Sequence, residues 1–242
     1  MNEKLLNLKR SFEELKWYEW IMTAIMIFIA GQAMVVGLTT GAASGNPAWL
    51  TVINFISAVC GIVCIFFCAK ANISNFCFGL VNTLVYAVYL FYWQIYGTFA
   101  LEMLFYLPMN IFSWWNWAKH RDKEITQKTM AKALTIKQNI VCIVAVTIGG
   151  IVTHHILATI GGTVPWLDAF TVTIGIIATI LELLRYREQY VWWLITDIVA
   201  VAMYIIKFDP VYLTKKSIYL IMAIIGLINW YKLHKLRNVE NE

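Results

Sequence analysis

Long apolar stretches alternate with short polar segments along almost the whole chain. Residues 49 to 69 and residues 71 to 101 contain no Asp, Glu, Lys or Arg. A helix of about 20 mostly apolar residues is long enough to cross the hydrocarbon core of a bilayer. Windows close to this length lie at 20 to 41, 49 to 69, 73 to 94, 99 to 118, 138 to 158, 165 to 184, 189 to 206 and 212 to 232. The pattern therefore predicts eight transmembrane helices.

One of these apolar segments occurs twice. Residues 106 to 117 read YLPMNIFSWWNW and residues 219 to 230 read YLIMAIIGLINW, with six of twelve positions identical. Matches at offsets of 115 and 117 extend the repeat upstream, among them Asn82 with Asp197. Internal repeats of apolar segments are typical of secondary transporters.

Composition and charge agree with a membrane protein. Hydrophobic residues make up 60% of the 242 residues and charged residues only 14%, which is more apolar surface than a soluble domain of this length can bury. Sixteen of the nineteen Lys and Arg residues fall on one side of the predicted membrane, six of them between 119 and 137. The positive-inside rule makes that side the cytoplasm. Both termini are therefore predicted to be cytoplasmic, and the net charge of +5 requires no nucleic-acid partner.

These observations predict an all-α membrane protein with two parallel three-helix repeats joined by a connector helix (3+1+3), plus an extra N-terminal helix. The repeats are parallel because a single connector crossing returns the chain to the outer face. Leu5, Leu8, Phe12 and Leu15 recur at helical spacing and predict an interfacial helix before the first span. The predicted segments are an interfacial region with the extra helix (1–46), the first repeat (47–118), a basic loop with the connector (119–164), the second repeat (165–232) and a tail (233–242).

Polar and aromatic side chains form stripes inside the predicted repeat helices. Tyr106, Asn110, Trp114 and Trp117 are spaced by four, four and three residues, which places them on one helix face. Similar stripes follow the other repeat helices, and four stripes from two repeats can converge on one cavity. The candidate substrate-binding residues are Asn82, Gln94, Tyr106, Asn110, Trp114, Gln189, Trp193, Asp197, Tyr204 and Tyr219.

Structural roles compete with binding roles for several of these residues. The Asn side chains could join neighbouring helices by hydrogen bonds, and the aromatic residues near helix ends are expected to belong to the interfacial belt. Those belt residues are Trp93, Trp117, Trp166 and Trp230. Asp197 lies near the middle of its span, where an acid faces a cavity or a partner; Lys207 and Tyr204 are the possible partners. Pro108 frees the carbonyl of Leu104 and predicts a kink just before Asn110.

The sequence contains few features that indicate an enzyme. It contains no GxSxG, HExxH, Walker A or GxGxxG motif, so hydrolase and nucleotide-binding activities are not indicated. Cys60, Cys64 and Cys68 share a helix face, but no His or acidic residue accompanies them in that span. These cysteines are interpreted as small packing residues, and neither a metal nor a cofactor is expected.

Residues 96 to 117 and residues 187 to 230 resemble the PnuC family of vitamin transporters. The resemblance covers roughly residues 47 to 232, and its W-x-x-W-like element is Trp114 to Trp117. The matching positions of the second half are Trp193, Asp197, Tyr204, Lys207, Thr214 and Tyr219. It implies a fold related to the SWEET sugar transporters, a trimer in the bacterial inner membrane, and uptake of nicotinamide riboside that a cytoplasmic kinase then phosphorylates.

The candidate residues suit this ligand chemically. Stacked Trp and Tyr rings can hold the cationic pyridinium, Asn and Gln amides match the carboxamide, and Asp197 can balance charge or accept from the ribose. Asp197 is the one acid predicted near a span centre, and no ATP-binding loop is present, so facilitated diffusion by alternating access is the expected mechanism. Transport of thiamine, another vitamin or a sugar stays open, as do an intramembrane enzyme and a receptor or structural role.

Overall fold

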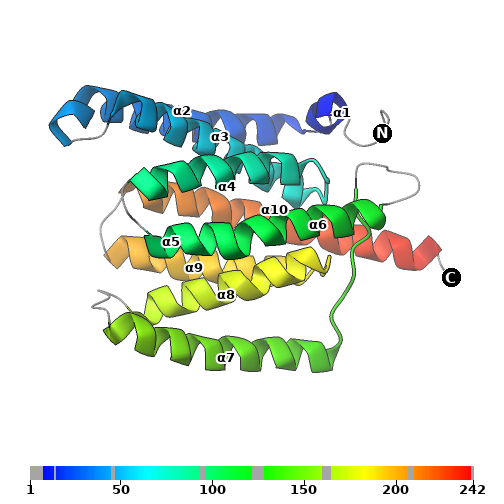
Figure 1. Ribbon diagram of the computed structural model, residues 1–242. Helices are drawn as coiled ribbons and strands as arrows, with labels where there is room; N and C mark the ends of the chain where they lie inside the picture. Colours follow the sequence, from blue (N-terminus) through cyan, green and yellow to red (C-terminus); the bar gives the residue numbers. More distant parts are fainter. Residues whose placement is uncertain are drawn as a thin grey trace. The chain divides into compact units, whose positions relative to one another are not determined.

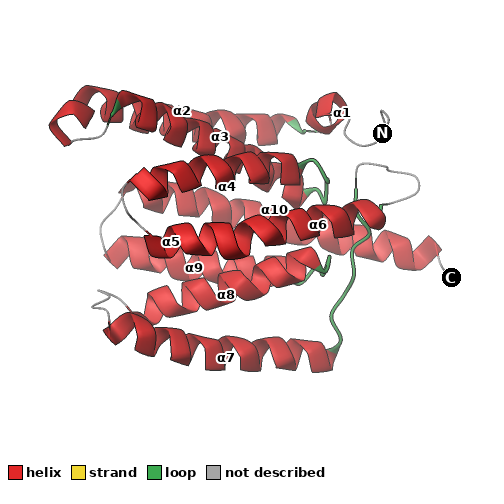
Figure 2. Ribbon diagram, in the orientation of Figure 1, coloured by secondary structure: helices red, strands yellow, loops and turns green. Residues whose placement is uncertain are grey.

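The structure is a computed structural model that describes residues 8–13, 15–44, 47–92, 96–121, 128–159, 165–206 and 210–240. In these ranges the secondary structure is helical apart from three isolated β-bridges, as Figure 2 shows. The chain divides into two compact units, which we call unit 1 (Met1–Thr129) and unit 2 (Met130–Glu242). Each unit is described by itself below.

Unit 1 begins with a short helix at the predicted interfacial segment and continues with four apolar segments. Consecutive segments pack against each other (Figure 1). The last segment is interrupted by a π-helical turn. The elements are α1 (Leu8–Glu13), α2 (Trp17–Ser44), α3 (Ala48–Ala69), α4 (Asn75–Tyr92), α5 (Tyr96–Leu101), the π-helix η1 (Glu102–Tyr106) and α6 (Leu107–Lys119).

Unit 2 has four helices, which also pack in the order of the chain. They are α7 (Ile136–Thr159), α8 (Pro165–Leu183), α9 (Gln189–Ile206) and α10 (Pro210–Glu240). In both units, therefore, four helical segments follow one another in sequence and in contact. The three-helix repeat boundaries derived from the sequence stay a prediction.

Several of these helices can span a membrane. Five combine the required length and hydropathy over the described residues: Trp17–Thr39, Ala48–Ala69, Asn75–Tyr92, Ile136–Thr159 and Lys216–Lys235. Ala169–Leu183 is a shorter apolar helix. The protein is thus a helical multi-pass membrane protein, and these five helices correspond to five of the eight windows found in the sequence.

The ends of α3 and α8 share one backbone geometry. Ala71 has φ 56° and Arg185, 114 positions later, has φ 65°. The N–H groups of Asn72 and Tyr186 each donate to the carbonyl five residues earlier, at 2.9 Å, as in a Schellman motif. Glycine usually occupies the left-handed position of this motif because it carries no Cβ. Neither turn contains one, so the surrounding contacts must maintain the strained backbone.

Two tryptophans set the packing at these turns. Trp117 and Trp230 are both 0% exposed, so the expectation that they belong to the interfacial belt was wrong. The ring of Trp117 packs edge-on against Phe76 at 4.8 Å, and that of Trp230 packs against Tyr190 at 5.9 Å. Phe76 and Tyr190 are each the second residue of the helix that follows the turn. The two Trp side chains are buried because each indole fills the space beside its turn.

The π-helix accounts for a one-residue difference between the repeats. Helices α4 and α9 are both 18 residues long and begin 114 positions apart, whereas Trp117 and Trp230 are 113 apart. A π-turn accommodates one extra residue within a helix, and the Leu107 N–H donates to the Glu102 carbonyl, five residues back. Pro108 follows directly, at the start of α6. The π-turn thus lies directly before Pro108, and the kink predicted at this proline stays a prediction.

Replacing Trp117 by Ala should lower the free energy of unfolding by about 3–5 kcal/mol, the range observed when a buried Trp or Phe is truncated. Trp115, 66% exposed on the same helix, provides the matched control, and its replacement should have little effect. Thermal denaturation of both purified variants in detergent measures the difference. Equal destabilisation would contradict the assignment of Trp117 to the core.

Candidate substrate-binding site

Asn82 joins two helices of unit 1. The Ser57 hydroxyl on α3 donates to Asn82 Oδ1 at 2.8 Å and also lies 3.2 Å from its backbone carbonyl. Gly61 faces the same amide, and a Cβ built there would lie 3.2 Å from Asn82 Oδ1. Asn82 therefore has the helix-joining role that competes with substrate binding for the asparagines, because its Oδ1 accepts an interhelical hydrogen bond.

Asn110 on α6 has unused hydrogen-bonding capacity. Its Oδ1 atom is buried and has no hydrogen-bond partner among the described residues. The amide lies against Gly79 on α4 so closely that a methyl group at this glycine would overlap Asn110 Nδ2. Tyr106 and Trp114, on the same stripe, are half-buried. Buried polar atoms are nearly always hydrogen-bonded, so this carbonyl is available to a water molecule or a ligand.

Two further amides occupy equivalent places in the two units. Asn75 begins α4 and Gln189 begins α9, 114 positions later. They are 1% and 0% exposed, and both polar atoms of each side chain have no hydrogen-bond partner within the described ranges. The sequence predicted Gln189 as a substrate-binding residue, whereas Asn75 was not among the predicted binding residues. The signal that identifies Asn75 is its position at the repeat equivalent of Gln189.

Asp197 forms an ion pair inside unit 2. Its Oδ1 atom lies 3.1 Å from Lys216 Nζ on α10, and the two side chains are 7% and 23% exposed. The same ammonium lies 5.2 Å from the ring centroid of Tyr219. The sequence offered Lys207 and Tyr204 as partners, but both side chains lie outside the described residues. Among the described residues Asp197 pairs with Lys216, one of the three basic residues that do not fall on the side predicted to be cytoplasmic.

The repeat places a second polar pair at the equivalent position of unit 1. Counting back 114 positions from Asp197 and Lys216 gives Thr83 and Glu102, and a side-chain hydrogen bond links these two residues. Each unit thus joins its third and fourth segments by one polar contact. The helix geometry aligns Asp197 with Thr83, one position from the Asn82 match found in the sequence.

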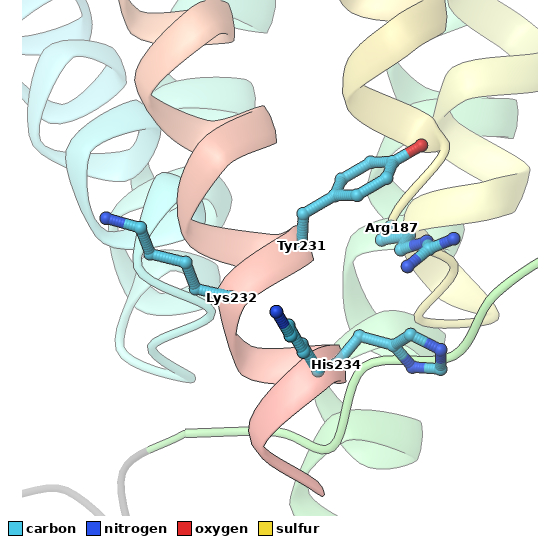
Figure 3. Close-up of a pocket in the computed structure, with 5 residues that line it drawn as sticks. Arg187, Tyr231, Lys232 and His234 are labelled. Carbon is cyan, nitrogen blue, oxygen red and sulfur yellow. The ribbon is translucent and has the colours of Figure 1, made fainter. Parts of the chain in front are cut away.

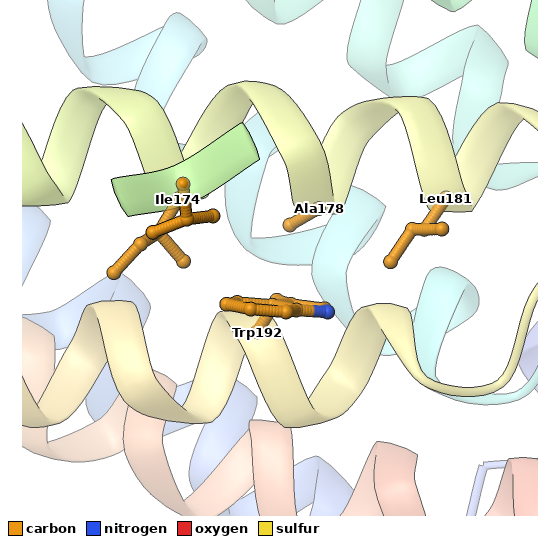
Figure 4. Packing of buried hydrophobic residues seen from close by; sticks show 5 residues of the cluster. Ile174, Ala178, Leu181 and Trp192 are labelled. Carbon is orange, nitrogen blue, oxygen red and sulfur yellow. The ribbon is translucent and has the colours of Figure 1, made fainter. Parts of the chain in front are cut away.

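The remaining candidates lie on or near α9 and α4. Trp193 is half-buried and packs against the core cluster of unit 2, where the Trp192 ring faces Ile174, Ala178 and Leu181 (Figure 4). Tyr204 lies on α9, with its side chain outside the described residues. Gln94 also lies outside them. The structure thus describes eight of the ten candidate side chains.

Apolar helices of spanning length, with buried amides inside the helical units, define a multi-pass membrane protein. The profile of a family described as "Nicotinamide mononucleotide transporter" matches residues 51–232. The chain therefore belongs to this family, the PnuC transporters.

Individual relatives and a solved structure support this family assignment. A nicotinamide riboside transporter PnuC of Neisseria mucosa is 31% identical over 229 residues, which cover 90% of this chain and 83% of the relative. The PnuC of Haemophilus influenzae is 32% identical over 192 residues, 79% of this chain and 83% of the relative. The crystal structure of the vitamin B3 transporter PnuC superimposes with a TM-score of 0.71 at 30% identity, over 94% of this chain and 96% of that one.

The ion pair of unit 2 can be tested by a double-mutant cycle. Asp197→Asn leaves the Lys216 ammonium without its partner and should lower the free energy of unfolding by about 2 kcal/mol, less than the roughly 3–5 kcal/mol of a fully buried pair, since 23% of the lysine side chain is exposed. Adding Lys216→Met removes the unpaired charge and should restore most of the loss. Denaturation in detergent gives all four free energies. Additive effects would show that the pair contributes no coupling.

Proposed function

We propose that this protein carries nicotinamide riboside across the bacterial inner membrane. The observation that supports this best is membership of the PnuC family together with close relatives named as nicotinamide riboside transporters. The solved relative of similar fold is titled a vitamin B3 transporter. Enzymatic activity is not part of the proposal, because these relatives are named as transporters.

The buried amides supply the chemistry that this substrate needs. Nicotinamide riboside carries a carboxamide, which can donate two hydrogen bonds and accept two, and a ribose with several hydroxyls. Asn75, Asn110 and Gln189 present buried polar atoms that the described residues leave unpartnered. An amide pairs with a carboxamide through complementary donors and acceptors. We assign these three side chains to substrate binding.

Aromatic rings of each unit belong to the proposed binding set. Trp114, Trp193 and Tyr106 are half-buried, and a cationic pyridinium is attracted to the face of such rings. Tyr219 contacts the Lys216 ammonium, so its ring face is already in use in this structure. Asn82, Asp197, Tyr204 and Gln94 complete the proposed binding set.

The proposed topology has eight transmembrane helices with both termini cytoplasmic, and the repeats run in the same direction. Support comes from the five helices of spanning length, from the sequential packing of four segments in each unit and from the distribution of Lys and Arg. By its family resemblance the protein forms a trimer. Parallel repeats permit alternating access through rocking of one half against the other.

Facilitated diffusion is the proposed mechanism, followed by trapping through a cytoplasmic kinase. The Asp197–Lys216 pair supports it, because the carboxylate already has a counter-ion within the protein at 3.1 Å. An acid that is balanced in this way requires no proton or sodium ion to enter a low-dielectric interior. The substrate's own gradient, maintained by phosphorylation, then suffices.

Replacing Asn110 or Asn75 by Ala should weaken nicotinamide riboside binding about tenfold each, the effect of one lost hydrogen bond. Gly79→Ala should have a similar effect, because the added methyl displaces the Asn110 amide. Asn139→Ala is the matched control, since that residue lies outside the proposed binding set and its amide donates to the backbone carbonyl of Thr135, directly before α7, in an exposed hydrogen bond of 3.1 Å. Isothermal titration calorimetry with purified protein measures the affinities, and thiamine and ribose serve as competitors. Unchanged affinity in both asparagine variants would assign these amides to packing.

Transport without coupling can be measured in proteoliposomes that lack nucleotide. Radiolabelled nicotinamide riboside should enter until the internal concentration equals the external one. Because the substrate is a cation, the membrane potential must be held at zero with potassium and valinomycin while a proton or sodium gradient is imposed. Accumulation above the external concentration under that clamp would exclude facilitated diffusion. Loss of this accumulation in Asp197→Asn would then identify Asp197 as the coupling residue.

A further inference from the structure

Unit 2 contains a basic pocket at the end of its last membrane-spanning helix. The cavity has a volume of about 440 Å³ and is lined by Arg187, Tyr231, Lys232, His234 and Lys235. Arg187 comes from the turn between α8 and α9, and the other four residues come from α10. Figure 3 shows Tyr231, Arg187 and His234 on one side of α10, with Lys232 extending to the other side.

The pocket has an excess of positive charge. The Arg187 guanidinium lies 4.0 Å from the ring centroid of Tyr231, and its Nε atom donates to Glu188 Oε1 at 2.9 Å. Glu188 balances one cation and also accepts the Leu134 N–H at 3.0 Å. No ion pair to Lys232 or Lys235 occurs within the described part of the chain. The terminal guanidinium nitrogens of Arg187 and the Lys235 ammonium therefore remain for an anion, while Lys232 extends to the other side of α10.

The place of the pocket favours a ligand at the membrane surface. The spanning stretch of α10 runs from Lys216 to Lys235, so the pocket lies at its last turn, at the level where phospholipid headgroups begin. Tyrosine at this depth is typical of the interface. Basic pockets beside transmembrane helices bind anionic headgroups. We propose that this pocket binds a phosphate group, in the membrane that of an anionic phospholipid.

This site is separate from the proposed substrate set, with which it shares no residue. Arginine suits phosphate because its planar guanidinium offers paired donors, and stacking on Tyr231 holds that plane in place. Phosphate bound here joins the α8–α9 turn to α10. Anionic lipid is therefore expected to stabilise unit 2 against unfolding.

The test uses the full chain purified in a neutral detergent, with phosphatidylglycerol, phosphatidylcholine and inorganic phosphate titrated separately and bound molecules counted by native mass spectrometry. Wild-type protein should bind phosphatidylglycerol more tightly than phosphatidylcholine. The double variant Arg187→Ala/Lys235→Ala should bind phosphatidylglycerol about 25-fold more weakly, since each cation near an anionic headgroup contributes roughly fivefold. Lys119→Ala/Lys137→Ala removes the same charge from two exposed positions and should bind like the wild type.

Lys235→Ala alone leaves the contacts of Arg187 with Glu188 and Tyr231 in place and should weaken binding about fivefold, so the test does not depend on the fold of the double variant. Inorganic phosphate binding with the same dependence on Arg187 and Lys235, without preference for phosphatidylglycerol, would support the phosphate site and assign its ligand to the solution. Binding of all three probes that is unchanged in both pocket variants would overturn the proposal.

Discussion

A polar side chain buried between apolar helices is costly unless it has a partner, and this constraint shapes both units. Where a partner exists, the pair joins neighbouring helices, as Ser57 and Asn82 join α3 to α4 at 2.8 Å and Asp197 and Lys216 join α9 to α10 at 3.1 Å. Where no partner is present among the described residues, as for Asn75 and Gln189, the unused hydrogen bonds have to be made by water or by a ligand. The same rule thus separates side chains whose hydrogen bonds or charges are satisfied between helices from side chains that still have unused hydrogen-bonding atoms.

The repeat conserves geometry and changes chemistry. The turns at Ala71 and Arg185 share a left-handed residue, and a buried indole packs beside each turn. At the equivalent polar contact, however, unit 1 has Thr83 with Glu102 and unit 2 has an ion pair. One extra residue in unit 1, accommodated as the π-turn, further alters the register of its last segment.

Much of this could be predicted from sequence, because apolar length and repetition are direct consequences of a bilayer environment. The helical class, the spanning segments and the family followed from those features and from the motif around Trp114. The burial of Trp117 and Trp230 could not be predicted, since a Trp near a helix end has the same local sequence whether it faces lipid or a turn. The two Schellman turns were also missed, because neither carries the glycine that normally marks one. The sequence predicted Lys216 on the outer side of the membrane, because hydropathy counts only the charge of the lysine. Hydropathy cannot show that Asp197, nineteen residues earlier, pairs with this charge.

The position of Lys216 bears on how the substrate could be moved. A lone carboxylate inside a membrane protein must be neutralised by a proton, a metal ion or a cationic ligand, and each of these would couple transport to that ion. A lysine on the next helix removes the need for such an ion, because the lysine's positive charge is part of the protein and moves with it. A cationic substrate close to this pair would be attracted by Asp197 and repelled by Lys216 to nearly equal degree. Under the proposed function, recognition then rests mainly on the neutral amides and the aromatic rings, whose directed hydrogen bonds and ring faces can hold and release the substrate without a change of charge in the protein.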